Sequence, residues 1–197
     1  MMKTERPPAP DFLRRNYKKW GKRYKKKRDN PKQSNDFNWA TFQSKKVNQL
    51  LLPTLQEMTN CHCSFCDGFP LDALGETIEH FRSKSHYPLV SYFWGNLFYC
   101  CNHCQKSKGE NPERLLLKPD KADYSFEKYF LFDYETGNLE INPALSAATE
   151  KAKAENIIKL YGLNKYNRPK RRKDCLQRFL KTSDADVEDF PYRFILI

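Results

Sequence analysis

Cys63-Ser-Phe-Cys66 and Cys101-Asn-His-Cys104 are the two stretches that decide the fold at the centre of this chain. In each, two residues separate the cysteines, and this gap lets both sulfurs of a pair reach one ion from a tight turn. Four thiolates suit tetrahedral zinc, so the two pairs predict one structural zinc site. Gly68, just after the first pair, fits such a turn.

Other residues beside the two pairs leave the register of this site open. Each of four neighbours could replace or join a ligand of the set: Cys61, His62, Cys100 and His103. We favour the first register because only those pairs have the two-residue gap. In a reducing compartment, cysteines clustered in this way indicate metal rather than disulfides. Cys175 stands apart and is expected to be an ordinary buried thiol.

The overall charge favours a polyanionic partner. The 197 residues include 35 Lys and Arg against 24 Asp and Glu, a formal net charge of +11. Nucleic acid is the first candidate and an anionic membrane surface the second. The 14 Phe, 11 Tyr and 3 Trp are too many aromatic residues for a disordered chain, so a compact domain is expected.

Targeting signals are not evident in the sequence. It contains no run of about 18 apolar residues, as a membrane-spanning helix would require. The first residues, MMKTERPPAPDF, lack the apolar core of a signal peptide. We therefore expect no membrane association and a cytoplasmic protein.

A strongly basic stretch follows an extended, proline-rich start over residues 1–12. It holds ten basic residues and no acidic one. These residues are Arg14, Arg15, Lys18, Lys19, Lys22, Arg23, Lys25, Lys26, Lys27 and Arg28. Interleaved Tyr17, Trp20 and Tyr24 favour a surface that follows phosphates and stacks on bases, and the alternative is a solvated, partly helical arm.

The rest of the chain suggests an α+β fold. A polar linker at 30–36 precedes an apolar stripe over 38–58 that predicts a helix, broken or restarted at Pro53. Alternating residues around 129–133 and 139–141 predict a hairpin. Asn142-Pro143 is expected to open a helix that ends at Gly162, and another follows from Arg168, with Leu176, Phe179 and Leu180 as its apolar side.

These elements predict three parts: a basic N-terminal arm over 1–35, a core with its preceding helix over 36–110, and a hairpin with a helical extension over 111–197.

Between and after the cysteine pairs lie residues suited to hydrolysis of phosphodiesters. Glu79-His80 follows Thr77-Ile78, Asn96-Leu97 follows Trp94-Gly95, and Lys108-Gly109 comes after the second pair. A zinc ribbon used only for binding has no task for a Glu-His pair. Phosphodiester hydrolysis needs a general base, for which an imidazole titrates in the right range. It also needs a hard divalent cation, and carboxylate and amide oxygens suit magnesium.

In this order, the residues resemble an HNH nuclease with a zinc-stapled ββα-metal core, flanked here by helical N- and C-terminal extensions. The match is most specific over residues 63–109, in runs such as IEHFRSKS at 78–85 and WGNLF at 94–98. Weaker similarity, including Arg6-Pro7-Pro8 and the run LYGLN at 160–164, extends over most of the chain. Together these motifs look like the PtuB-type HNH component of Septu and retron-associated antiphage systems.

The resemblance implies a role for each motif position. His80 would be the general base and Glu79 a ligand of the catalytic magnesium or manganese. Asn96 would brace the loop that orients His80, and Lys108 would lie near the phosphate. Gln105 stands where the family usually has Asn or His as a second metal ligand. A glutamine could bind directly or through water, and Asn102 is the alternative.

The same resemblance implies that the substrate is DNA or RNA and that the partner is an ABC-like or SMC-like ATPase. Two other functions stay open at this point. One is a non-catalytic zinc module that binds nucleic acid or docks the ATPase. The other is an adaptor whose basic arm binds the ATPase, while the ATPase holds the DNA. Its acidic tail and final apolar residues, FPYRFILI at 190–197, could then form the docking surface.

Overall fold

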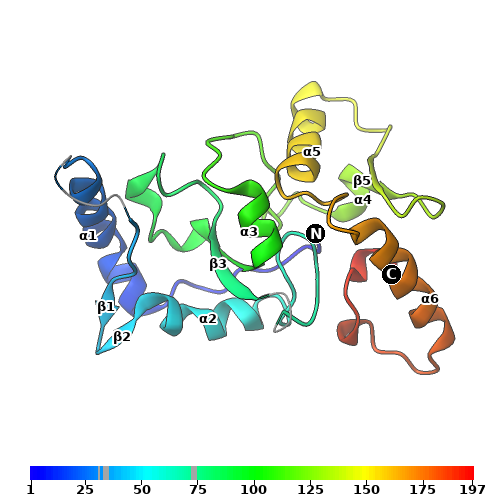
Figure 1. The fold of residues 1–197 in the computed structure, drawn as a ribbon, viewed down its shortest axis with the longest axis horizontal. Coiled ribbons are helices and arrows are strands. Elements are labelled where there is room, and N and C mark those ends of the chain that lie inside the picture. Colours follow the sequence, from blue (N-terminus) through cyan, green and yellow to red (C-terminus); the bar gives the residue numbers. More distant parts are fainter. Residues whose placement is uncertain (31, 33–35, 72–74) are drawn as a thin grey trace.

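The computed structural model describes residues 1–30, 32, 36–71 and 75–197 (Figure 1). In this part of the chain the fold is mixed α+β, with helices around small two-stranded antiparallel sheets. That agrees with the fold class expected from the sequence. The predicted linker at 30–36 falls largely outside the described residues. Figure 1 shows α1 at one end of the molecule, β3 and α3 in the middle and α6 at the other end.

The N-terminal segment and its helix both pack against the body of the protein. Residues 1–10 form no helix or strand, as expected, but Arg6 forms an ion pair with Asp120 at 2.6 Å. Helix α1 (Asp11–Arg28) follows. Its last four residues are cations, and they lie at the end where the helix dipole favours positive charge. At Gly21 a side chain would meet the Leu89 carbonyl oxygen at 2.6 Å, so the helix lies very close to the backbone at Leu89.

Burial along α1 separates its two kinds of residue. Trp20 and Tyr24 are buried, and their rings contact Tyr92 and Phe37 with centroids 5.4 and 4.9 Å apart. Most of the ten cations are exposed, and Lys27 and Arg28 are half-buried. Trp20 and Tyr24 are therefore core residues, and the expectation that they offer exposed stacking faces is wrong.

The helix predicted over residues 38–58 is wrong in its first half. Strands β1 (Thr41–Phe42) and β2 (Lys45–Lys46) form a small hairpin there instead. Its two turn residues, Gln43 and Ser44, both have positive φ, as in a type I′ hairpin turn.

Helix α2 (Val47–Glu57) follows the hairpin and continues through Pro53, which was expected to break it. Leu51 and Leu55, on either side of the proline, are fully buried. Each such burial is worth about 1.5–3 kcal/mol, which offsets the lost hydrogen bond.

The centre of the molecule is a strand–strand–helix unit. Strand β3 (Glu76–His80) pairs with β4 (Leu97–Cys101) in antiparallel register, with Glu79 opposite Phe98. Two short 3₁₀ turns, η1 (Pro88–Val90) and η2 (Trp94–Asn96), lie in the connection between the strands. Helix α3 (Asn102–Lys108) follows β4 directly and contacts both strands.

The C-terminal half contains the predicted hairpin. After the short helix α4 (Phe126–Tyr129), strands β5 (Phe130–Phe132) and β6 (Leu139–Ile141) pair as expected. Helix α5 (Ala148–Leu160) ends at Gly162, which has φ +59°, as predicted.

The start expected for α5 is wrong, because Asn142 forms a turn. Its side-chain oxygen accepts from the amide of Ala144, and its carbonyl accepts from the amide of Leu145. An asparagine side chain that satisfies nearby amides in this way competes with helix formation.

Helix α6 (Arg168–Lys181) and the tail close the fold. Cys175 is buried on this helix, as expected, whereas Leu180 is 74% exposed and does not belong to its apolar side. The tail folds back through η3 (Val187–Asp189) and η4 (Arg193–Ile195). Phe190, Tyr192, Phe194 and Ile195 are buried, so most of the apolar tail belongs to the core and is no free docking surface.

In the described part of the chain, no helix combines the length and the apolar character that crossing a membrane requires.

Candidate metal centre and active site

Four cysteine sulfurs lie together at the junction of α2, β4 and α3. They belong to Cys63, Cys66, Cys101 and Cys104, all buried, and lie within 4.8 Å of one another. Tetrahedral zinc with bonds of about 2.3 Å places its sulfurs about 3.8 Å apart. The separation of 3.7 Å between the sulfurs of Cys66 and Cys101 fits that geometry. This cluster could therefore hold a structural metal such as zinc.

Backbone turns hold these sulfurs in place. The amide of Cys63 donates to the Gly68 carbonyl, and the amide of Asp67 donates to the Cys63 carbonyl. Amides also point at the sulfurs themselves, since Cys104 N lies 3.5 Å from Cys101 Sγ. Such donors stabilise thiolate charge.

The alternative ligands lie elsewhere. Cys61 is exposed, and Cys100 is 4.0 Å from the Cys63 sulfur but does not join the group of four. His62 bonds the Phe190 carbonyl at 3.1 Å, and His103 stacks on the ring of Tyr166.

A buried arginine from α6 faces the same cluster. Arg168 donates to Cys104 Sγ at 3.1 Å and also to the carbonyls of Tyr161 and Gly162. Burial lowers the pKa of this guanidinium, but the cysteine sulfurs around it outweigh that effect and raise it. Zinc with four thiolates carries a net charge of −2, so a fixed cation here offsets part of the charge that is buried. The sequence analysis missed Arg168, because only the tertiary fold brings position 168 to position 104.

Glu79 and His80 end strand β3 at the wall of a cavity of about 230 Å³. Gln105 and Lys108 line the same cavity from α3. The fold thus brings together four residues that the sequence analysis singled out. Asn96 is not among the residues that line this cavity.

Glu79 is buried and forms an ion pair with Lys108. The Lys108 Nζ lies 2.5 Å from Glu79 Oε1 and also donates to the His80 carbonyl. Burial raises the pKa of Glu79 to about 7, although the charge of Lys108 opposes this effect. Lys108 is itself buried, and its ammonium points at the Glu79 carboxylate.

The imidazole of His80 is held by a carbonyl and an aromatic ring. Its Nε2 lies 3.0 Å from the carbonyl oxygen of Ser91, which can only accept, so Nε2 carries the proton. Nδ1 is then the basic nitrogen. The Trp39 ring stacks on the imidazole with centroids 5.3 Å apart. Burial lowers the pKa of His80 to about 3, so the ring is neutral at pH 7.

Asn96 ties down the loop that follows β3. Its Oδ1 accepts from the Arg82 amide at 2.6 Å, and its Nδ2 donates to the carbonyls of Arg82 and Val90. The loop carries Ser91, whose carbonyl holds His80, so Asn96 braces the element that orients the imidazole.

Gln105 lines the cavity from α3 and contacts strand β3 directly. Its Nε2 donates to the Thr77 hydroxyl at 3.0 Å and to the Ile78 carbonyl at 3.2 Å. This orientation leaves the Oε1 atom as the one that could reach a cation beside Glu79. Asn102 instead lies beside Gly75, to which its backbone amide donates.

A second carboxylate lines the cavity that the sequence analysis did not single out. Glu110 pairs with Lys84 at 2.5 Å and accepts from the Ser83 hydroxyl at 2.6 Å. Burial alone would raise the pKa of Glu110, but the hydrogen bonds from Lys84 and nearby serines lower it well below its usual range. In the sequence, only the position of Glu110 directly after Gly109 indicated that it could belong to the site.

The chemistry available in this cavity is proton transfer next to a carboxylate and an amide. A neutral imidazole can take a proton from water, and the oxygens of Glu79 and Gln105 are ligands that suit a hard divalent cation.

Compared with models of known protein families, the chain matches none, and no curated protein matches its sequence.

Proposed function

We propose that this chain is a metal-dependent endonuclease of the HNH type that hydrolyses phosphodiester bonds in nucleic acid. The observation that carries the proposal is the position of Glu79 and His80 at the end of β3, with Gln105 facing them from α3 across one small cavity. The order strand, strand, helix, beside a four-cysteine cluster, also matches the HNH core that the motifs resemble.

Each residue then has a task. His80 Nδ1 takes the proton of the attacking water, while the Ser91 carbonyl keeps the ring in the required tautomer. Glu79 and Gln105 would hold magnesium or manganese, which neutralises charge on the phosphate and the leaving oxygen. Asn96 keeps the loop and the imidazole in place.

The wider biological setting rests on the sequence motifs. They support an effector of antiphage defence that works with an ABC-like ATPase, in the cytoplasm, where cysteine thiols stay reduced. The net charge of +11 supports a nucleic-acid substrate.

The test is cleavage of plasmid, linear DNA and tRNA by purified protein, with and without magnesium and the ATPase. We expect His80→Ala to lower cleavage by about 10²–10⁴-fold while zinc content stays the same, because only the general base is lost. His103→Ala is the control, with zinc content measured in parallel, since this exposed histidine stacks on Tyr166 and does not line the cavity with Glu79. Equal cleavage by His80→Ala and the parent protein would exclude this assignment.

One observation favours a second candidate, a non-catalytic zinc module that binds nucleic acid or docks the ATPase. The Lys108 ammonium already neutralises Glu79, so a divalent cation would have to share or displace this contact. Titration with manganese separates the two. If this is a nuclease site, the parent protein should bind manganese and Glu79→Gln should not. If Glu79 and Lys108 form only a structural ion pair, neither the parent protein nor Glu79→Gln should bind manganese.

A further inference from the structure

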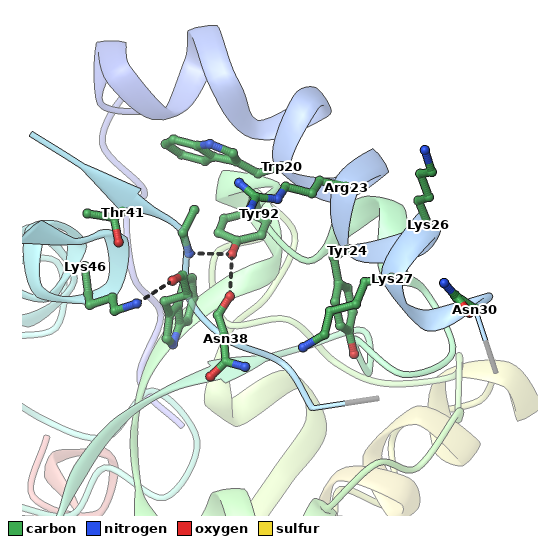
Figure 2. A pocket seen from close by; sticks show the side chains of 12 residues that line it. Trp20, Arg23, Tyr24, Lys26, Lys27, Asn30, Asn38, Thr41, Lys46 and Tyr92 are labelled. Carbon is green, nitrogen blue, oxygen red and sulfur yellow. Dashed lines mark hydrogen bonds between the residues drawn. The ribbon is translucent and has the colours of Figure 1, made fainter. Parts of the chain in front are cut away.

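A separate cavity of about 760 Å³ lies between helix α1 and the β1–β2 hairpin (Figure 2). Its volume is within the range of small-molecule and cofactor sites, which is about 300–1,000 Å³. Neither the cysteine cluster nor the cavity at Glu79 accounts for it.

Positive charge surrounds this cavity. Arg23, Lys26 and Lys27 line it from α1, and Lys46 lines it from β2, while none of the described residues that line it is acidic. Figure 2 shows Arg23 and Lys27 approaching from the helix and Lys46 from the hairpin. Lys27 donates to the Asp36 carbonyl, and each lysine has further N–H groups to offer. The site is therefore suited to an anion such as phosphate.

Aromatic rings and fixed polar groups form the rest of the wall. Trp39 is half-buried and lines the cavity together with Tyr92. The Tyr92 hydroxyl accepts from the Ala40 amide at 2.8 Å and donates to the Asn38 carbonyl at 3.2 Å, which holds the ring and the hairpin together (Figure 2). A rigid wall with an indole and cations matches the two parts of a nucleotide, a flat base and a charged phosphate.

Trp39 also connects this cavity to the proposed active site. The indole that lines the cavity stacks on the imidazole of His80 at an interplanar angle of 22°. A ligand against the cavity wall would therefore lie one aromatic ring away from the proposed general base.

We propose that this cavity binds one unpaired nucleotide of a nucleic-acid strand, beside the bond that is cut. This inference rests on the proposed function, and it defines the substrate class as a strand that is single or locally opened. The base lies against the aromatic wall, and the adjacent phosphate contacts Arg23 and Lys46. Duplex cannot present a base in this way without opening, so it should bind by charge alone.

The experiment measures binding without cleavage. Single-stranded DNA and RNA oligonucleotides of one sequence, each with a central 2-aminopurine, are titrated with protein in buffer without added magnesium. Stacking of the base should quench its fluorescence with both strands or with one of them, which identifies the sugar that is preferred. The matching duplex should bind without quenching.

Paired variants locate the site. Arg23→Ala/Lys46→Ala removes one arginine of α1 and one lysine of β2 that line the cavity. Lys165→Ala/Arg171→Ala removes one lysine and one arginine from exposed positions at and just before helix α6, away from the cavity. We expect the first pair to weaken single-strand binding about tenfold or more and to abolish quenching. The second pair should change affinity by no more than about threefold and keep the quenching.

Equal effects of the two pairs, or equal quenching by duplex and single strand, would overturn the inference. Failure of the proposed function is distinguishable, because quenching that depends on Arg23 and Lys46 can occur in a protein that cuts nothing. Cleavage that persists in Arg23→Ala/Lys46→Ala with unchanged KM would remove the subsite and leave the nuclease.

Discussion

At the scale of single residues, Gln105 tests whether the cavity at Glu79 holds a metal. Its Nε2 donates to Thr77 and Ile78, and its Oε1 is the side-chain atom that can ligate a cation. We expect Gln105→Ala to raise the magnesium concentration needed for half-maximal cleavage by about tenfold or more, while manganese rescues part of the rate. The measurement is the cleavage rate at a series of magnesium concentrations.

Two further variants interpret that result. Gln105→Asn should keep activity or improve it, because it restores the residue that the resembled family uses. Ser107→Ala, at a neighbouring position of α3 that does not line this cavity, is the control for helix stability. An unchanged magnesium dependence in Gln105→Ala would show that position 105 is no ligand, and Asn102 would be tested next.

Arg168 is the buried cation that offsets the negative charge of the cysteine cluster by direct contact. Its guanidinium touches Cys104 Sγ from a buried position, so Arg168→Leu would leave the net negative charge of a zinc-thiolate centre less compensated. We expect zinc affinity to fall about 10–100-fold, measured by competition with a chromogenic chelator. Arg171→Leu, at an exposed position of the same helix, should bind zinc like the parent protein. The same zinc affinity in both variants would contradict this role.

At the scale of elements, Pro53 offers a test of helix α2. The residue is exposed, so its ring contributes little packing, yet it removes a backbone donor inside the helix. Pro53→Ala should stabilise the protein by about 2 kcal/mol, because the cost of about 3 kcal/mol for proline in a helix is only partly offset, by about 0.4–1 kcal/mol, by the greater freedom that alanine gives the unfolded chain. Thermal unfolding measures the effect, with Thr54→Ala as the neighbouring control. A lower melting temperature in Pro53→Ala would count against this account.

Local signals in the sequence were sufficient for some elements. The hairpin β5–β6 and the end of α5 at Gly162 follow from alternation and from a glycine that adopts positive φ. The two cysteine pairs likewise carry their geometry in their spacing. These features depend on residues close together in the chain.

Other features depend on contacts between distant residues and left no such signal. Trp39 looks like part of an apolar helical stripe, but it lies just before a hairpin and stacks on His80. The apolar stripe predicted a helix here. Residues 38–46 contain no glycine to indicate a turn, yet Gln43 and Ser44 form one with positive φ. Arg168 reads as one more cation in a basic run until the fold places it on Cys104.

At the scale of the whole molecule, the cysteine cluster joins the two halves of the chain. Cys63 and Cys66 follow α2, whereas Arg168 begins α6. The tail strengthens the same junction, because Arg193 pairs with Asp67 at 2.7 Å right after the first cysteine pair. A metal bound here would therefore stabilise the arrangement of both halves as well as one loop.

Figure 1 places α1 and α6 at opposite ends of the molecule, with strand β3 and helix α3 of the proposed active site between them. Each of these ends carries exposed cations. Arg15, Lys19 and Lys22 are exposed on α1 at one end. A duplex or long strand that reaches the cavity at Glu79 from this end would contact α1. The exposed cations near α6 would then contact no phosphate.

Salt dependence of binding distinguishes the two faces. We expect alanine at Arg15, Lys19 and Lys22 together to flatten the slope of log K against log salt, by up to about 0.9 for each phosphate of duplex DNA that the protein no longer neutralises. Alanine at Lys165, Lys170 and Arg171, which removes the same charge at the other end, should change the slope little. Equal flattening in both triple variants would mean that the substrate spans the whole molecule. If only the second variant changes the slope, the nucleic acid binds along α6, and α1 is then free to bind the ATPase.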